Sequence, residues 1–210
     1  MVPAVVALAG CGGSSGKAQG AGGAPPSVSP GSSVQAAGAR AGAAGSRERA
    51  ALARLRAMGL PVYCGGRHGH LVALTFDDGP GPYTHFALKE LRQARARATF
   101  FLVARSIQRF PAWPRRELTL AALGDHTATH ADLLGLPPAG VTREIALGRE
   151  AVRNAAGRPV LLFRPPYGAR SQLIDQEVSR QGMVEVLWSI DSGDSNVVQP
   201  QNYAAISRTV

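Results

Sequence analysis

Lysine and aromatic residues are scarce in this sequence. Lys17 and Lys89 are the only lysines, so arginine carries nearly all of the net charge of +9. Aromatic residues make up 6% of the chain, and no basic stripe with interleaved aromatic side chains is present, which argues against nucleic acid as a partner. The arginine preference accompanies abundant alanine and glycine and mostly reflects coding bias. The positive field still favours a polyanionic setting such as a cell wall or membrane surface.

The amino terminus has an apolar run that is too short to cross a bilayer as a helix. Residues 1–11 end in Leu8-Ala9-Gly10-Cys11, which resembles a bacterial lipoprotein cleavage box. We therefore predict an export signal over residues 1–11, a membrane anchor formed by lipid on Cys11, and an extracytoplasmic location. A chance apolar terminus is the alternative. Because no Lys or Arg precedes the run, the true start codon stays open.

Cysteine is also rare, since Cys64 is the only one besides Cys11. If Cys11 carries lipid, Cys64 has no disulfide partner, and a disulfide framework is excluded. A lone cysteine is commonly a small buried hydrophobe, and we expect this of Cys64.

The remaining chain divides by composition. Residues 12–45 are almost wholly Gly, Ala, Ser, Pro and Gln, a composition that cannot bury enough apolar surface to offset the entropy of ordering, so we predict a disordered linker. Residues 46–70 form a helical and loop lead-in, with a helix over 46–58. Residues 71–210 then form one domain, for which 45% hydrophobic residues provide a sizeable core.

Strand and helix patterns alternate along this domain. The patterns predict strands at 71–76, 99–103, 160–163 and 184–190, helices at 84–96, 141–155 and 171–181, and a segment at 106–123 that is helical in parts and interrupted at Pro111 and Pro114. Such alternation implies parallel pairing, hence an α/β barrel or a doubly wound sheet. Each polar motif sits just after a predicted strand or in the loop beyond it, so we expect them all on the one face where the strands' carboxyl ends build a site.

Two of these motifs have the composition of a metal-dependent hydrolytic site. His126 and His130 are four residues apart, so on a helical turn both imidazoles would project to one side. With one carboxylate from Asp77-Asp78 the site has three ligands and leaves a fourth position for water, as in catalytic zinc sites. The other carboxylate could accept a proton, with Arg164 as a fixed cation beside it. Taken singly, the aspartates could instead form an Asp-Gly turn, and the histidines could be surface residues.

The motifs together resemble those of the polysaccharide deacetylases of carbohydrate esterase family 4. The resemblance covers about residues 61–194 and is carried in order by Thr75-Phe76-Asp77-Asp78-Gly79 with Pro80-Gly81-Pro82, Ala98-Thr99-Phe100-Phe101, His126-Thr127-Ala128-Thr129-His130 and Arg164-Pro165-Pro166-Tyr167. It implies a distorted (β/α) barrel that removes N-acetyl groups, or less often O-acetyl groups, from a glycan. It also implies a divalent metal, zinc in the first place, although cobalt, nickel or iron would suit the same ligands.

The resemblance also assigns roles to particular residues. Asp77 becomes the general base, and Arg164 orients it. Asp78, His126 and His130 become the metal ligands. Tyr167 would lend its backbone amide to the oxyanion, and Asp191, from a fourth motif, would assist the general acid.

Two departures from the family pattern leave the activity open. Ser195 stands where the fourth motif usually has a tryptophan that lines the acetyl pocket, and no histidine follows His130, although the family's general acid is a histidine in a later fifth motif. We therefore expect a barrel that is incomplete at the carboxyl terminus. The alternatives are an envelope deacetylase, acting on peptidoglycan or a related wall glycan ahead of chitin and acetylated xylan; a metal-binding but catalytically weak glycan-binding protein; and a truncated reading frame of such an enzyme.

Three further side chains carry weaker expectations. Trp188 lies in a buried-strand pattern and is expected in the core rather than as a platform for substrate. His85, close to the predicted site entrance, could contact substrate. His68 and His70 flank a loop and are expected to be solvated.

Overall fold

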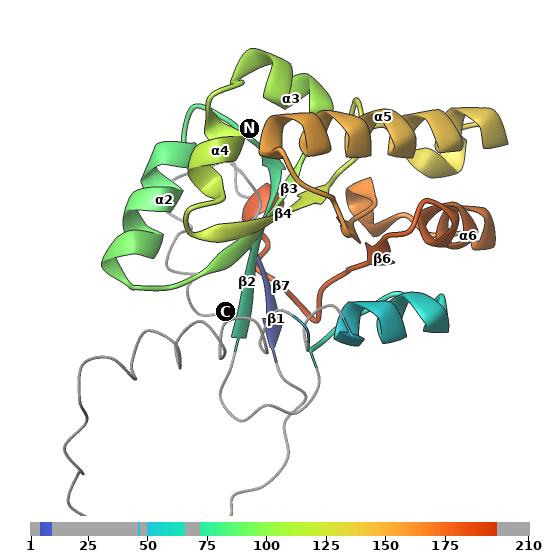
Figure 1. Ribbon diagram of the computed structural model, residues 1–210, viewed down its shortest axis with the longest axis horizontal. Coiled ribbons are helices and arrows are strands. Elements are labelled where there is room, and N and C mark those ends of the chain that lie inside the picture. The colour runs from blue at the N-terminus through green and yellow to red at the C-terminus, as the bar shows by residue number, and fades with distance from the viewer. Residues whose placement is uncertain (1–4, 10–45, 47–49, 66–71, 197–210) are drawn as a thin grey trace, which may run out of the picture.

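The computed structural model of the chain describes residues 5–9, 46, 50–65 and 72–196 (Figure 1). Cys11, the predicted linker at 12–45, and both His68 and His70 lie outside these residues. Within the described residues no helix combines the length and the apolar character needed to span a membrane.

The fold is built on five parallel strands, of which the alternating pattern predicts four. The sheet order is β6-β5-β4-β3-β2-β1-β7. Its parallel members are β2 (Val72–Gly79), β3 (Ala98–Leu102), β4 (Ala121–Asp125), β5 (Leu162–Phe163) and β6 (Val184–Glu185). The short strand β1 (Val5–Ala9) pairs antiparallel with both β2 and β7 (Ile190–Asp191). The α/β class is therefore confirmed.

Helices connect and cover these strands (Figure 1). They are α2 (Thr84–Gln93), α3 (Ala104–Arg109), α4 (Trp113–Glu117), α5 (Pro138–Ala156) and α6 (Gln172–Arg180), with residues 50–58 also helical and short 3-10 turns η1 (Leu133–Gly135), η2 (Pro166–Gly168) and η3 (Asp194–Asn196). The long helix α5 packs against α3, α4, α6 and β4. It ends where predicted, at Gly157, whose φ of 69° gives the left-handed backbone of a common helix C-cap.

The predicted helical segment 106–123 is wrong in its last part. Residues 104–109 and 113–117 are helical, but Ala121–Asp125 form β4, which pairs in parallel along its whole length with β3. Two alanines and a glycine give β4 little intrinsic strand preference, so the pairing with β3 decides its conformation. The predicted strand 184–190 is likewise not continuous. Only its two ends belong to named strands, residues 184–185 to β6 and residue 190 to β7.

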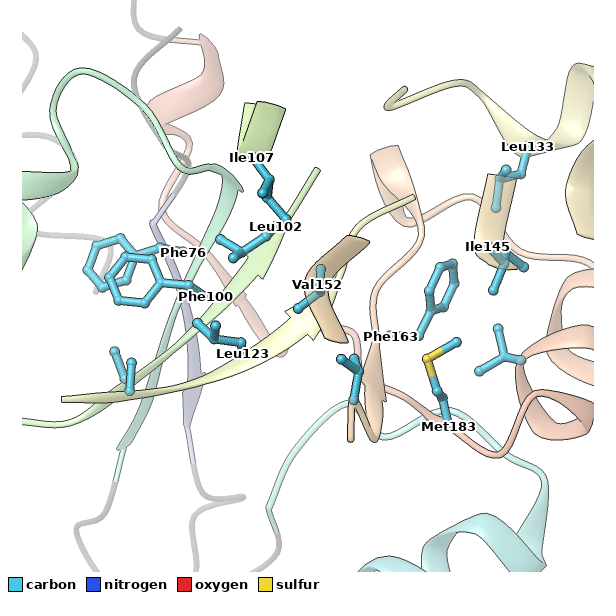
Figure 2. Packing of buried hydrophobic residues seen from close by; sticks show 14 of the residues in the cluster. Phe76, Phe100, Leu102, Ile107, Leu123, Leu133, Ile145, Val152, Phe163 and Met183 are labelled. Atoms are coloured by element: carbon cyan, nitrogen blue, oxygen red, sulfur yellow. The ribbon is translucent and has the colours of Figure 1, made fainter. Parts of the chain in front are cut away.

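The hydrophobic core has two parts because successive side chains of β3 point to opposite faces. Phe100 stacks on Phe76 with 4.8 Å between ring centroids, in the larger cluster under the helices (Figure 2). Phe101 lies on the other face, in a cluster against which Leu52 and Leu55 of the lead-in helix pack. Residues 50–58 therefore belong to the folded domain and cover one face of its sheet.

A carboxylate lies buried beside the strand that carries the two aspartates. Glu117 of α4 is fully buried, and neither of its carboxylate oxygens has a hydrogen-bond partner among the described residues. A Cβ built on Gly79 would lie 4.0 Å from its Oε1. Burial raises the pKa of Glu117 to about 8, because the charged form has lost its hydration without gaining a partner.

This burial predicts a stability that falls as pH rises. The native state holds the Glu117 proton up to about pH 8, whereas the unfolded chain releases it near the ordinary value of 4.5. The stabilisation is complete below the unfolded pKa and is lost as pH rises through the native one. Urea unfolding at pH 5 and pH 8 should show a decline about 2–4 kcal/mol smaller in Glu117→Gln than in the wild type. Equal declines in the two proteins would contradict the assignment.

Candidate metal centre

Three of the predicted ligands converge at the carboxyl ends of β2 and β4. Asp78 stands near the end of β2, His126 directly follows β4, and His130 lies in the loop beyond. Their ligand atoms all lie within 4.8 Å of one another. Asp78 Oδ1 is 2.9 Å from His130 Nε2 and 3.5 Å from His126 Nε2. The three side chains thus present a carboxylate oxygen and two ring nitrogens to one point.

The hydrogen bonding around the centre suits a cation. His126 Nδ1 lies 2.6 Å from the Arg164 carbonyl oxygen; since a carbonyl only accepts, Nδ1 donates this hydrogen bond and Nε2 is the ring nitrogen that faces Asp78. This is the usual support of a metal-binding histidine. The buried Asp78 Oδ1 has no aligned hydrogen-bond donor among the described residues. Burial alone would raise the pKa of Asp78, but the imidazoles of His126 and His130 hold it well below its usual range.

The histidine pair is not on a helical turn, contrary to the sequence prediction. Residues 126–130 form a loop in which Thr127 and His130 have φ of 71° and 62°. Asp78 and Tyr167 also have left-handed backbone, with φ of 65° and 62°. Four of the five non-glycine residues with positive φ in the described chain therefore belong to this site. Such conformations persist where surrounding contacts enforce them, and they cluster at functional sites.

The histidine loop is held by side chains that sequence reasoning missed. The buried Asp125 accepts the Thr127 amide at 2.8 Å, and Thr127 Oγ1 accepts the His130 amide at 3.0 Å. From α5, Glu144 accepts the amide and the hydroxyl of Thr129 at 2.9 and 3.0 Å. The backbone amides of Thr127, Thr129 and His130 thus each donate to a side-chain oxygen. The sequence Asp125-His126-Thr127 could have indicated these contacts, since aspartate and threonine side chains commonly accept hydrogen bonds from nearby backbone amides.

Gly148 in the middle of α5 allows the helix to approach this loop. A Cβ at this position would overlap Asp125 Oδ1 and would lie 2.6 Å from the Thr127 carbonyl carbon. Glycine inside a helix costs about 1 kcal/mol relative to alanine, so its presence indicates a packing requirement. The requirement is the contact between α5 and the residues flanking His126.

Gly148→Ala should therefore weaken metal binding. The added methyl displaces Asp125 and Thr127, and loss of such outer support typically lowers metal affinity about 10- to 100-fold. Zinc titration followed by calorimetry measures the change. Gly140→Ala is the matched control in the same helix, because its methyl would lie 3.3 Å or more from any neighbour. Wild-type zinc affinity in Gly148→Ala would contradict this explanation.

The neighbouring carboxylate, Asp77, belongs to a different set of contacts. Its Oδ1 accepts a 2.8 Å hydrogen bond from Nη1 of Arg164, which is completely buried. The guanidinium also donates to Thr75 Oγ1 and to the carbonyls of Val186 and Leu187, all at 2.9 Å. Burial raises the pKa of Asp77 more than the charges of His126 and Arg164 lower it.

Aromatic rings enclose Arg164. The Arg164 guanidinium lies 4.2 Å from the centre of the Phe101 ring and 5.5 Å from that of Trp188. Trp188 is half-buried rather than a core residue, and a Cβ on Gly168 would come within 2.9 Å of its ring. It therefore forms a wall beside the site.

The remaining predicted residues lie at different distances from this centre. Tyr167 is 70% exposed, and its ring meets that of His130 edge-on with centroids 4.8 Å apart. Asp191 is exposed at the end of β7, where its Oδ1 accepts the Gly193 amide at 2.8 Å. No contact within residues 72–196 joins Asp191 to the three ligands. Ser195 and His85 are exposed.

The fold and the site together define an α/β protein with a candidate mononuclear metal centre and a separate acid–arginine pair. The chain belongs to the polysaccharide deacetylase family, whose sequence model matches residues 65–186. A chitooligosaccharide deacetylase of Azorhizobium caulinodans is 35% identical over 134 residues, or 62% of this chain and 64% of the relative. A peptidoglycan-N-acetylglucosamine deacetylase of Bacillus cereus is 34% identical over 61% of this chain and 49% of the relative.

Solved structures agree with this placement. A family 4 carbohydrate esterase from Streptomyces lividans, in complex with acetate, superposes with a TM-score of 0.60 at 32% identity, covering 64% of this chain and 69% of the other. The Bc1960 peptidoglycan N-acetylglucosamine deacetylase gives the same TM-score at 30% identity, over 65% of this chain and 63% of that one. The chain thus spans about half to two thirds of the curated relatives' length.

Proposed function

We propose that this chain hydrolyses N-acetyl groups on an acetylated glycan of the cell envelope, with O-acetyl groups as the lesser possibility. The observation that carries the proposal is that two adjacent carboxylates have different contacts. Asp78 faces two imidazoles, while Asp77 is held by a buried arginine. The names of the relatives, which act on chitooligosaccharide and peptidoglycan, support the choice of an N-acetylated sugar polymer.

Asp78, His126 and His130 would hold the divalent metal. One carboxylate and two histidines with the remaining position open suit catalytic zinc, and the same donors also suit cobalt, nickel or iron. An ion bound there would act as a Lewis acid toward the acyl carbonyl and would make water more acidic.

Asp77 is the proposed general base. Arg164 contacts its Oδ1, which leaves Oδ2 outside this ion pair to take the proton as water attacks the acetamide carbon. Burial raises the pKa of Asp77, and a carboxylate with a raised pKa accepts protons more readily. As the C–N bond then breaks, acetate and a sugar amine are released.

Two further roles follow from the family resemblance. The backbone amide of Tyr167 would stabilise the oxyanion, a contribution that the neighbouring ring contact with His130 makes spatially reasonable. Asp191 would assist protonation of the leaving amine. The proposed setting is extracytoplasmic, with lipid on Cys11 anchoring the chain to the membrane; cleavage at the predicted box would remove β1, which precedes Cys11.

The proposed base predicts a specific loss of activity in Asp77→Asn. Acetate release from an N-acetylglucosamine oligomer in the presence of zinc should fall at least about 100-fold, since a positioned base contributes about 10²- to 10⁴-fold. Zinc affinity should stay close to wild type because Asp78 supplies the ligand. Glu150→Gln, on the exposed surface of α5, is the control for carboxylate loss. Unchanged acetate release from Asp77→Asn would refute the assignment.

The proposed metal ligands predict a loss of zinc that does not depend on turnover. Replacing both His126 and His130 by Ala leaves only Asp78, so zinc binding measured by calorimetry should fall below detection. His85→Ala removes an exposed imidazole away from the triad and should bind zinc like the wild type. Stoichiometric zinc retained by the double variant would place the metal elsewhere.

A second candidate function is glycan binding with little turnover. Ser195, at the position of the fourth-motif tryptophan, is small and exposed, so that position provides no aromatic wall for the proposed acetyl pocket. In that case zinc and oligosaccharide would bind, but no acetate would appear above the Asp77→Asn background. The acetate assay therefore separates the two functions.

A further inference from the structure

A cleft of about 500 Å³ opens directly beside the metal ligands. Asp78 and His130 line one end of it. The loop after β2, Pro80 to Pro82, forms one wall, and α3 with the following Phe110 forms the other. A sugar next to the one that carries the acetyl group would have to pass through such a space.

The wall formed by α3 is positively charged. Arg105 and Arg109 both line the cleft, both are exposed, and they are four residues apart, so they lie on the same side of the helix. No carboxylate within the described residues forms an ion pair with either guanidinium. Asp78 is the only acidic residue that lines the cleft, and it faces His126 and His130. Among the residues that the structure describes, the positive charge of this wall therefore has no acidic partner.

The spacing of the two arginines is a further feature of this wall. Like charges four residues apart disfavour a helix slightly. Arg105 and Arg109 accept this repulsion on the side of the cleft that α3 forms beside the candidate metal centre.

We propose that the cleft between α3 and the loop after β2 binds a carboxylate on the sugar next to the acetylated one, so that the substrate is an acidic glycan rather than a neutral one. A guanidinium presents paired N–H donors that match a carboxylate. The half-buried Phe110 provides an apolar surface for the sugar ring, as mixed apolar and polar linings do in ligand sites. This inference rests on the proposed function, which supplies the acetylated glycan as substrate. The new element is that this glycan carries a negative charge.

Calorimetric binding tests the proposal without requiring turnover. Three oligomers of equal length are compared: neutral N-acetylglucosamine, N-acetylglucosamine alternating with a lactyl-ether-bearing sugar, and N-acetylglucosamine alternating with a uronic acid. The wild type should bind at least one acidic oligomer about five- to twentyfold more tightly than the neutral one at low salt, and the preference should shrink as ionic strength rises. The acidic oligomer that binds more tightly shows whether the site prefers the carboxylate of a lactyl ether or that of a uronic acid.

The variants assign the preference to the two arginines. Arg105→Gln combined with Arg109→Gln should reduce the preference below about twofold. Arg95→Gln combined with Arg97→Gln removes the same two charges from exposed residues that precede β3 and do not line the cleft, and this variant should retain the preference. Circular dichroism confirms that all three proteins are folded.

The outcomes separate this proposal from the deacetylase proposal. Equal affinity for neutral and acidic oligomers, absence of binding to any of them, or a preference that persists in the double variant would each overturn the acidic-glycan site, even if acetate were released. A preference that disappears in the double variant would support it, even if no acetate were released.

Discussion

The buried ion pair between Arg164 and Asp77 is the contact on which the arrangement of the site depends. The guanidinium joins β2, through Thr75 and Asp77, to the carbonyls that follow β6, although these strands are far apart in the sheet order. The backbone carbonyl oxygen of Arg164 accepts a hydrogen bond from His126 Nδ1 and so holds that imidazole in place. One residue therefore positions the proposed base with its side chain and a proposed metal ligand with its backbone. Loss of either charge would leave the other unpaired in the interior, at a cost of about 3–5 kcal/mol.

This pair also explains how two adjacent aspartates can have different roles. Asp77 is 6% exposed and faces a fixed cation, and burial raises its pKa, whereas the pKa of Asp78 is held low by the imidazoles. The positive φ of Asp78 belongs to the same distinction, because it turns the backbone at the point where the two side chains separate. Different surroundings, rather than different residue types, thus distinguish the carboxylate that we propose as the base from the one that we propose as a metal ligand.

Much of this site could be predicted because its residues follow strand ends. Asp77, Asp78 and Arg164 follow predicted strands, which was enough to place them at one edge of a parallel sheet. His126 follows β4, a segment that the sequence pattern predicted as helical, so its place at this edge came from the histidine motif and the family resemblance. The supporting contacts could not be predicted. Asp125 and Gly148 are 23 residues apart in sequence and meet only because α5 packs on β4. The helical turn inferred from the spacing of His126 and His130 was wrong because the left-handed Thr127 brings the rings together in a loop instead.

The helix that carries the proposed site for acidic sugars is hydrogen-bonded to the loop that carries His126 and His130. The amides of Ala104 and Arg105, at the start of α3, donate to the carbonyls of Thr127 and Ala128 at 3.1 and 3.0 Å. The backbone that carries the Arg105 guanidinium is thereby fixed to the loop that carries both histidines. A carboxylate bound at this wall would hold its sugar in a defined position relative to those histidines. Reaction rates depend strongly on such positioning, so contacts with the neighbouring sugar could contribute to catalysis as well as to affinity.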